Sequence, residues 1–190
     1  MDNRRQRHLA TRDDIVAAAW RLSGEHGLTG WSLRELAGAV GVRAPSLYVY
    51  FTGKDQIYDE MFSRSYSELL EQSRILDLPN DPIGRLRAIA YWFFDFAVAN
   101  PARLQLMFWR VVPGFEPSEG SYAVSRQVME LFEQRFFEVG IAEPAALDTW
   151  TAMLSGLVTQ QMSNEPGGDR WRRLLDQCVE MFAREFVRAG

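Results

Sequence analysis

The chain is poor in the residues on which disulfides and most metal sites depend. Its 190 residues include one cysteine and two histidines. Cys178 therefore has no partner for an internal disulfide, and its apolar neighbours indicate a buried filler rather than a redox group. His8 and His26 lack the paired spacing of a metal site, so we predict no bound metal.

Long apolar runs and short catalytic motifs are also missing. No apolar run approaches the roughly 18 residues of a membrane helix, and the polar N-terminus lacks the apolar stretch of a signal peptide. We therefore expect a cytoplasmic protein without a membrane partner. The sequence has no glycine-rich phosphate loop and no G-x-S-x-G motif, so we predict no catalytic residues, no cofactor and no enzyme activity. A helical enzyme that combines carboxylates from several helices stays open, although nothing favours it.

Positive charge is concentrated at one end of the chain. Residues 1–54 contain eight Lys or Arg and five Asp or Glu, a balance of +3, whereas residues 55–190 contain 13 and 20, a balance of −7. The net charge of −4 therefore combines a basic head with an acidic body. This distribution indicates contact with a polyanion through the head, while the body resists nonspecific adsorption.

Residues 32–51 fit a helix-turn-helix. Ser32 and Glu35 have the spacing of a capping box, which starts the first helix. Gly41 suits the left-handed conformation of the turn, and Pro45 suits the first position of the second helix. The apolar positions recur on one face of each helix: Leu33, Leu36, Ala37, Val40, Val42, Leu47, Tyr50 and Phe51.

Two cations stand where a helix dipole disfavours them. Arg34 lies in the first turn of the first of these helices, and Lys54, the single lysine beside twenty arginines, lies at the start of the next predicted helix. A cation at a helix N-terminus is favourable when an external anion approaches that end. DNA phosphate is the obvious anion, and this favours DNA binding.

Residues 11 to about 62 resemble the DNA-binding domain of TetR-family transcriptional regulators. The matching segments are Thr11–Ile15, Trp31–Ala37, Val40–Val42, Pro45–Phe51 and Lys54–Ile57. The resemblance implies an all-α fold, with a three-helix helix-turn-helix DNA-binding domain followed by a helical-bundle domain for ligand binding and dimerisation. It also implies a homodimeric repressor that a small apolar or aromatic effector releases from a palindromic operator. The alternative is a helical small-molecule-binding protein without functional DNA binding.

The resemblance also assigns the DNA contacts. Base contacts would come from the recognition helix and the start of the preceding helix: Arg34, Arg43, Ala44, Pro45, Ser46 and Tyr48. Phosphate contacts would come from Ser32, Tyr48, Tyr50 and Lys54. Each arginine could bind guanine through two hydrogen bonds, and Ala44 and Pro45 suit a thymine methyl group. A packing role for the tyrosines and a solvated surface role for Arg34 stay open.

Proline and glycine divide the rest of the chain into further helices. We predict helices at 54–74, 83–99, from 101 to before 113, 118–139, 144–163 and 168–188. The predicted domains are a flexible basic arm at 1–10, the DNA-binding domain at 11–53 and the effector-binding and dimerisation domain at 54–190. The arm is either a solubilising tail or a segment that lies along DNA.

Aromatic residues and methionine are frequent in the body. They could line a pocket for an apolar ligand, although a packed core explains the same pattern. The 83–99 segment is apolar on more than one face, with Phe93 on its main stripe, and is predicted to cross the centre of a bundle. The predicted pocket residues, with polar groups that could orient a ligand, are Trp92, Phe93, Phe96, Arg103, Met107, Phe108, Arg110, Gln127, Phe132, Trp150 and Met153, with Asp95 as a further polar group.

The last two predicted helices have the character of an association surface. Small residues recur at helical spacing on the first of them, which allows close approach of another helix. In the family that the chain resembles, these helices form a four-helix dimer bundle, and a two-fold dimer suits two half-sites on DNA. The predicted interface residues are Ala152, Ser155, Gly156, Thr159, Leu174, Cys178 and Phe182.

Overall fold

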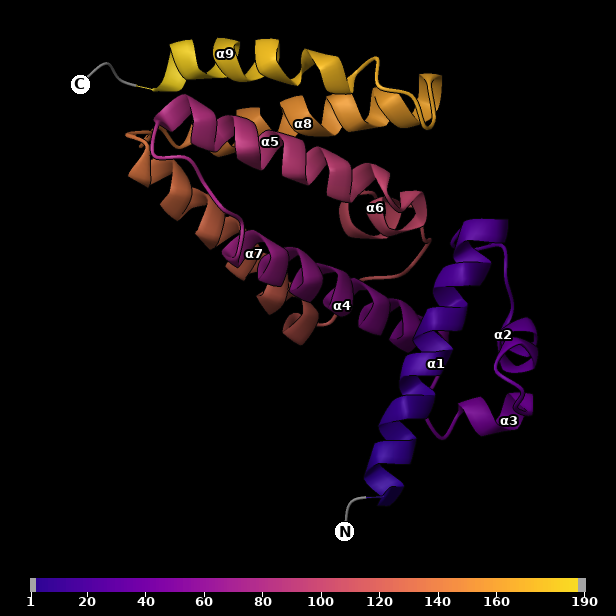
Figure 1. The fold of residues 1–190 in the computed structure, drawn as a ribbon. Coiled ribbons are helices and arrows are strands. Elements are labelled where there is room, and N and C mark those ends of the chain that lie inside the picture. The colour runs from indigo at the N-terminus through magenta and orange to yellow at the C-terminus, as the bar shows by residue number, and fades with distance from the viewer. Residues whose placement is uncertain (1–2, 188–190) are drawn as a thin grey trace. The chain divides into compact units, whose positions relative to one another are not determined.

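The computed structural model describes residues 3–187, and all its regular elements in that range are helices (Figure 1). They are α1 (Asn3–His26), α2 (Leu33–Ala39), α3 (Ala44–Leu47), α4 (Lys54–Arg74), α5 (Pro82–Val98), α6 (Pro101–Phe108), α7 (Glu119–Glu138), α8 (Ala145–Asn164), the 3-10 helix η1 (Arg172–Leu174) and α9 (Leu175–Phe186). The all-α prediction is confirmed. Within 3–187, no helix is long and apolar enough to cross a membrane, and no group of metal-ligating side chains could hold an ion.

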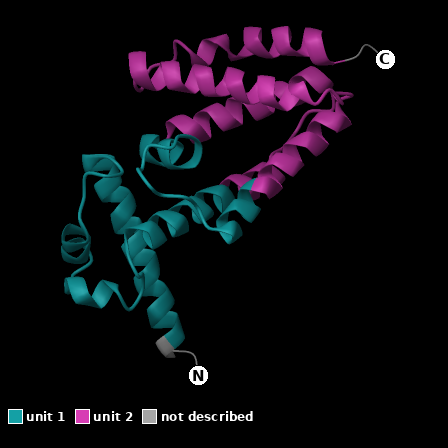
Figure 2. Cartoon of the chain, turned by 180° about the vertical axis from the view of Figure 1, so that it is seen from behind, with its two compact units in different colours: residues 1–68, 100–125 teal, residues 69–99, 126–190 magenta. Residues whose placement is uncertain are grey.

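The chain forms two compact units (Figure 2). Unit 1 comprises residues up to Glu68 together with Asn100–Ser125, and unit 2 comprises Leu69–Ala99 together with residues from Arg126 onward. The division therefore falls within α4 and α7 rather than at the predicted boundary between residues 53 and 54. The first half of α4 belongs to unit 1 because Tyr58 packs against both Trp31 and Phe115.

The segment predicted as a flexible arm belongs to α1 from Asn3 onward. Two side-chain contacts involve the residues of α1 before and at the predicted start, Thr11. The Thr11 hydroxyl donates to the Arg7 carbonyl within the helix, at 2.9 Å. The His8 ring lies 4.7 Å from the Tyr50 ring. Residues 1 and 2 of the arm lie outside the described residues.

The predicted starts of α5 and α6 are confirmed, and their caps explain them. Asp81 precedes Pro82 and accepts a hydrogen bond from the Gly84 N–H at 2.6 Å. Asn100 precedes Pro101 and accepts one from the Arg103 N–H at 3.0 Å. In both helices a side chain thus satisfies a free N–H of the first turn, and the proline stands where no N–H is needed.

The last helix begins later than predicted, at Leu175 instead of near residue 168. Gly167 has a φ of 76°, which ends helical continuity after α8. The Glu165 carboxylate then accepts from the Arg170 N–H, and the Gln161 side chain accepts from the Trp171 N–H. These bonds hold residues 165–171 as a turn, and η1 follows before α9 starts.

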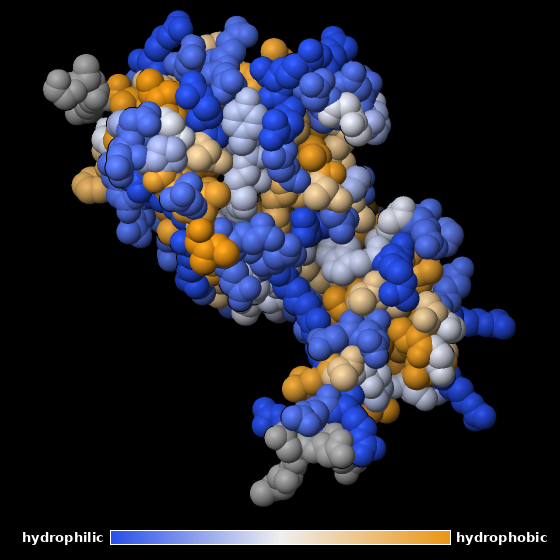
Figure 3. Space-filling view, viewed as in Figure 1, coloured by the Kyte–Doolittle hydropathy of each residue, from blue (hydrophilic) through white to orange (hydrophobic). Residues whose placement is uncertain are grey.

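The core of unit 2 is aromatic. The Trp150 ring lies 5.6 Å from the Phe136 ring and 4.9 Å from the Phe182 ring, and Trp150 and Phe182 are each 3% exposed. α5 packs against α8 and α9, and its deepest aromatic is Phe94 at 1% exposure rather than Phe93, which is half-buried. On the face shown in Figure 3, hydrophobic residues form separate patches among hydrophilic ones.

Candidate nucleic-acid interface

The capping box predicted for Ser32 and Glu35 is present at the start of α2. The Glu35 N–H donates to the Ser32 hydroxyl oxygen at 3.2 Å, and the Ser32 N–H donates to the Glu35 carboxylate at 2.7 Å. The Ser32 hydroxyl also donates to that carboxylate at 2.7 Å. These hydrogen bonds from the side chain and backbone of Ser32 lower the pKa of Glu35. The cap therefore fixes the end of α2 at which Arg34 is exposed.

The turn between α2 and α3 has the predicted geometry. Gly41 has a φ of 71°, and the Val42 N–H donates to the Ala37 carbonyl at 3.0 Å. Ala37 is buried, and its small side chain allows α2 and α3 to approach closely where they cross. α3 contains a proline in its first turn but is regular only over Ala44–Leu47, and residues 48–50 continue as turns. The predicted recognition helix at 45–51 is therefore correct at its start and too long at its end.

The predicted base-contacting residues are accessible. Arg34, Arg43, Pro45 and Tyr48 are exposed, with Tyr48 at 58%, while Ala44 and Ser46 are half-buried. The opposite faces of the two helices carry Leu36 and Leu47, both buried. The fold thus holds one apolar side of α2 and α3 in the core and leaves the candidate base-reading side free.

Lys54 has a role within the chain that the sequence did not indicate. Its ammonium group donates to the Trp31 carbonyl at 2.7 Å and to the Thr29 carbonyl at 3.3 Å, and it lies 4.1 Å from the centre of the Trp31 ring. Burial of the ammonium lowers the pKa of Lys54. Because Ser32 follows Trp31, these contacts join the start of α4 to the cap of α2. We therefore leave Lys54 out of the proposed phosphate contacts.

Arg12 makes the corresponding connection for the end of α3, and sequence reasoning missed it. Its guanidinium donates to the Tyr50 carbonyl at 2.9 Å and to the Glu60 carboxylate at 2.6 Å, and lies 4.3 Å from the centre of the Phe51 ring. The partners are 38 and 48 residues away, so no local sequence pattern could have found them. Arg12 ties the turn after α3 to both α1 and α4.

Glu60 joins Arg12 to a second arginine. Its carboxylate also accepts from Arg64 Nε at 2.7 Å, and Arg64 pairs with Asp13 at 2.7 Å. Burial opposes the charged form of Glu60, but the hydrogen bonds from Arg64 and Arg12 outweigh it, so the pKa of Glu60 is lowered. This network holds α1 against α4. These two helices precede and follow α2 and α3 in the chain.

Two buried aromatic side chains of the same unit have their polar groups paired. Trp31 Nε1 donates to the Ser23 hydroxyl oxygen at 2.9 Å. The Tyr58 hydroxyl donates to the Leu28 carbonyl, and burial raises the pKa of Tyr58 to about 12. Both residues are nearly inaccessible to solvent, so these hydrogen bonds position the segment that leads into α2.

Comparison with known proteins identifies this arrangement. The profile of bacterial regulatory proteins of the tetR family matches residues 15–61. The HTH-type transcriptional regulator AcrR of Shigella flexneri is 31% identical over 105 residues, which are 54% of this chain and 49% of the relative. The "Probable acrEF/envCD operon repressor" of Escherichia coli K12 is 24% identical over 194 residues, 92% of this chain and 87% of that relative.

The chain carries a DNA-binding domain of the TetR family at residues 15–61. It spans about half the length of the first curated relatives that it matches, at 49% and 52%. The crystal structure of AibR in complex with isovaleryl coenzyme A and operator DNA has a TM-score of 0.69 and 20% identity, and the match covers 90% of this chain and 97% of that one. At that identity, the likeness shows the fold alone.

The predicted effector-pocket residues divide between the two units. Arg103, Met107, Phe108 and Arg110 lie in unit 1, and Trp92, Phe93, Phe96, Gln127, Phe132, Trp150 and Met153 lie in unit 2. Arg103 pairs with Glu68 at 2.9 Å, whereas Arg110 and Gln127 are exposed. Trp150 belongs to the packed core of unit 2. Trp92 Nε1 donates to the Gln72 side chain at 3.3 Å, a polar contact that the prediction did not include.

The predicted dimer residues are accessible with one exception. Ala152, Gly156 and Leu174 are exposed, and Ser155, Thr159 and Cys178 are partly exposed. Phe182 was a wrong prediction, because its ring packs inward against Phe136 and Trp150. Its neighbour Met181, which was not predicted, is 59% exposed and extends the outward apolar stripe that runs from Leu174, at the end of η1, to Cys178 on α9.

Proposed function

We propose that this protein is a sequence-specific DNA-binding transcriptional regulator of the TetR family. The observation that carries the proposal is the exposed set Arg34, Arg43, Pro45 and Tyr48 around α2 and α3. These side chains project from two short helices whose other faces are buried, and the capping box and the Lys54 and Arg12 contacts hold those helices in place. A helix held in this way can enter the major groove of DNA.

The proposed contacts follow from the chemistry of each side chain. Arg34 and Arg43 would each donate two hydrogen bonds to guanine, while Ala44 and Pro45 would contact a thymine methyl group. Ser46 and Tyr48 complete the base-reading set. Ser32, Tyr48 and Tyr50 would contact phosphates, which position the protein without reading sequence.

A homodimer would present two copies of this surface. We propose that α8 and α9 form the contact, through Ala152, Ser155, Gly156 and Thr159 on α8, Leu174 at the end of η1, and Cys178 on α9, now joined by Met181. Small residues on α8 allow close helix packing, and the exposed stripe of α9 supplies apolar area. A two-fold dimer fits a palindromic operator with half-sites roughly 34 Å apart.

We further propose that the protein is a repressor controlled by a small apolar or aromatic effector. AibR, which shares the fold, was crystallised with isovaleryl coenzyme A and operator DNA, and one relative is named an operon repressor. Binding of the effector and binding of the operator DNA would be coupled, because the effector would change the separation of the two recognition helices in the dimer. Each would then weaken binding of the other by the same factor.

The first experiment is selection from a pool of random duplex DNA by the purified, ligand-free protein at two salt concentrations. We expect enrichment of a palindromic site. Salt-sensitive retention without an enriched motif would contradict sequence-specific recognition. Absence of any binding would favour a helical ligand-binding protein instead.

The enriched site then tests the two arginines individually. Arg34→Ala and Arg43→Ala should each cost about 1–3 kcal/mol of binding free energy and relax the preference at one base position. The matched control is Arg21→Ala, which removes the same charge from an exposed position of α1. Losses that are equal for all DNA sequences would reassign the arginines to phosphate contact.

A further inference from the structure

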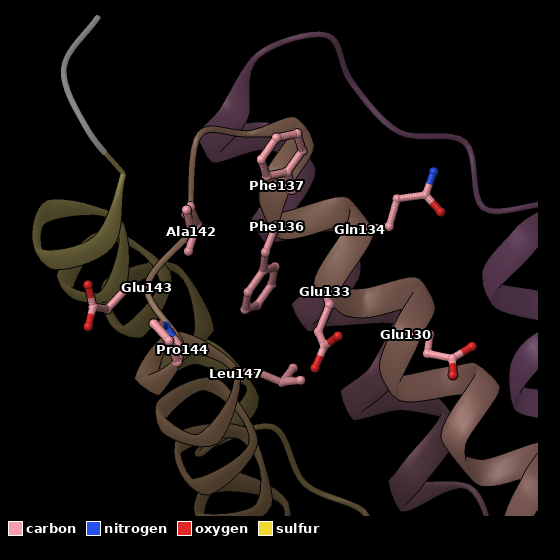
Figure 4. Close-up of a pocket in the computed structure, with 10 residues that line it drawn as sticks. Glu130, Glu133, Gln134, Phe136, Phe137, Ala142, Glu143, Pro144 and Leu147 are labelled. Atoms are coloured by element: carbon pink, nitrogen blue, oxygen red, sulfur yellow. The ribbon is translucent and has the colours of Figure 1, made fainter.

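A groove of about 550 Å³ lies in unit 2 beside the end of α7 and the start of α8. In Figure 4, Phe136, Glu133 and Leu147 point into the space between these two helices. Phe137 lies at its edge and is 73% exposed, an unusual position for an aromatic side chain. The groove thus combines an aromatic and aliphatic lining with an accessible ring.

The polar lining of the groove is acidic. It includes the carboxylates of Glu130, Glu133 and Glu143 and contains no Lys or Arg. All three glutamates are exposed. In residues 3–187, none of their side chains makes a hydrogen bond or ion pair, whereas Glu138 on the same helix pairs with Arg85 at 3.3 Å. Aromatic rings with unpaired carboxylates suit a guanidinium group, which stacks on the rings while it pairs with the carboxylates.

The other end of α8 carries such groups. Arg170 and Arg173 are exposed in the segment between α8 and α9. The Arg170 guanidinium lies 5.1 Å from the centre of the neighbouring Trp171 ring, and Arg173 pairs with Asp169 at 3.3 Å with both side chains more than two-thirds exposed. A pair so open to water contributes little stability and can exchange partners. Arg172 is already held by two bonds to Asp95, so it is not among the available cations.

We propose that this groove receives Arg170 and Arg173 of a second copy of the chain. The inference rests on the proposed homodimer and specifies its orientation. Two α8 helices related by a two-fold axis perpendicular to them run antiparallel, which places the start of each beside the end of the other. A parallel pair would set the acidic ends together and the arginine-bearing ends together, which costs binding energy.

The register of the small-residue stripe agrees with this orientation. Gly156 is the exposed central glycine of that stripe. If the two helices cross at Gly156, 11 residues of α8 precede the crossing and eight follow it, so the start of each helix lies near the end of the other and near the segment that bears Arg170 and Arg173. The groove therefore adds a pairing of opposite charges, between its glutamates and Arg170 and Arg173 of the second copy, at each end of the proposed α8 and α9 contact.

The test is a set of charge reversals in the full-length protein. One variant combines Glu133→Arg with Glu143→Arg, and another combines Arg170→Glu with Arg173→Glu. Each should raise the dimer dissociation constant by about tenfold or more at low salt, measured by sedimentation equilibrium. The matched control combines Glu71→Arg with Asp77→Arg, two exposed carboxylates of unit 2 outside the groove. It should dimerise like the wild type.

Recovery of dimerisation when the reversals are combined distinguishes a direct contact from damage to the fold. The two variants mixed in equal amounts should form a heterodimer with affinity near that of the wild-type dimer, because both grooves then face opposite charge. The variant with all four reversals should also recover dimerisation. Circular dichroism spectra equal to that of the wild type would show that the separate variants are folded.

The remaining outcomes separate this inference from the proposed function. A wild-type dimer whose affinity none of the reversals changes would overturn the groove contact and leave the proposed dimeric regulator intact. A wild type that stays monomeric both alone and on its selected DNA site would overturn the homodimer itself. If tetraphenylphosphonium binds the wild-type dimer and loses binding with Glu133→Arg, the groove is a site for lipophilic cations, and the contact between copies is wrong.

Discussion

The α2–α3 segment of unit 1 and the long helices of unit 2 are stabilised by different interactions: polar contacts in the first and aromatic packing in the second. α2 and α3 have seven and four residues, too few to be stable helices by themselves, and they depend on polar contacts to neighbouring segments. In unit 2, α8 has 20 residues and is fixed by the rings of Phe136, Trp150 and Phe182. The candidate DNA surface therefore depends on a few directional bonds, and the body depends on packed area.

This difference has a functional meaning. Directional bonds fix the angle at which short helices present Arg34 and Arg43, as base recognition requires. Contacts between packed aromatic rings allow small displacements of whole helices. The proposed response to an effector would require such displacements in unit 2. Substitutions that remove one kind of contact from each region should reveal the contrast.

The largest effect is expected in the aromatic core. Trp150→Ala should reduce the free energy of unfolding by about 3–5 kcal/mol, because it removes a buried ring and leaves a cavity. The measurement is urea denaturation followed by far-UV circular dichroism. The control is Ile75→Ala at a side chain that is 84% exposed, which should change stability by less than about 0.5 kcal/mol. Similar losses for both would show that the ring cluster does not hold unit 2.

Arg12→Ala should have the next largest effect, centred on the turn after α3. Its side chain is 27% exposed, and loss of its charged bonds to Tyr50 and Glu60 should cost about 1.5–3 kcal/mol. Hydrogen exchange should become faster for the Tyr50 and Phe51 amides, which bond to the Leu47 carbonyl. Arg21→Ala is the matched control. Equal exchange in the two variants would refute the proposed connection.

Ser32→Ala tests the cap of α2. Loss of the hydroxyl should cost about 1 kcal/mol, because the Glu35 N–H then lacks its acceptor. It should also weaken operator binding, since Arg34 lies in the first turn of that helix. Ser163→Ala, at an exposed position of α8, should leave both quantities unchanged. If Ser32→Ala lowers stability but leaves DNA affinity unchanged, the stability of α2 does not control DNA recognition.

The smallest effect is expected from pH. The folded protein lowers the pKa of Glu60 below the unfolded value of about 4.3, so the unfolded chain binds more protons in that range. The contribution of Glu60 is present above the unfolded pKa and is lost as pH falls through the folded pKa. Between about pH 6 and pH 3, the wild type should lose more stability than Glu60→Gln. Parallel curves for the two proteins would contradict the lowered pKa.

The sequence predicted the α2–α3 segment well because its determinants are local. Ser32 and Glu35 are three residues apart, Gly41 sets its own backbone angle, and Pro45 fixes the start of α3. Each signal acts within one helical turn. The prolines at 82 and 101 likewise located the starts of α5 and α6, where the structure shows Asp81 and Asn100 as the caps.

Tertiary structure decided which way side chains point and which distant partners they meet. Met181 and Phe182 are adjacent and both apolar, so composition could not show that Phe182 meets Phe136 while Met181 faces outward. The sequence predicted Lys54 as a phosphate contact and gave Arg12 no role. In the fold, Lys54 donates to the Trp31 carbonyl and Arg12 to the Glu60 carboxylate. The sequence by itself determined the helices and their caps, because these depend on neighbours a few residues apart. The rotation of each helix and the positioning contacts of the DNA surface depend on packing between distant segments, which only the folded chain contains.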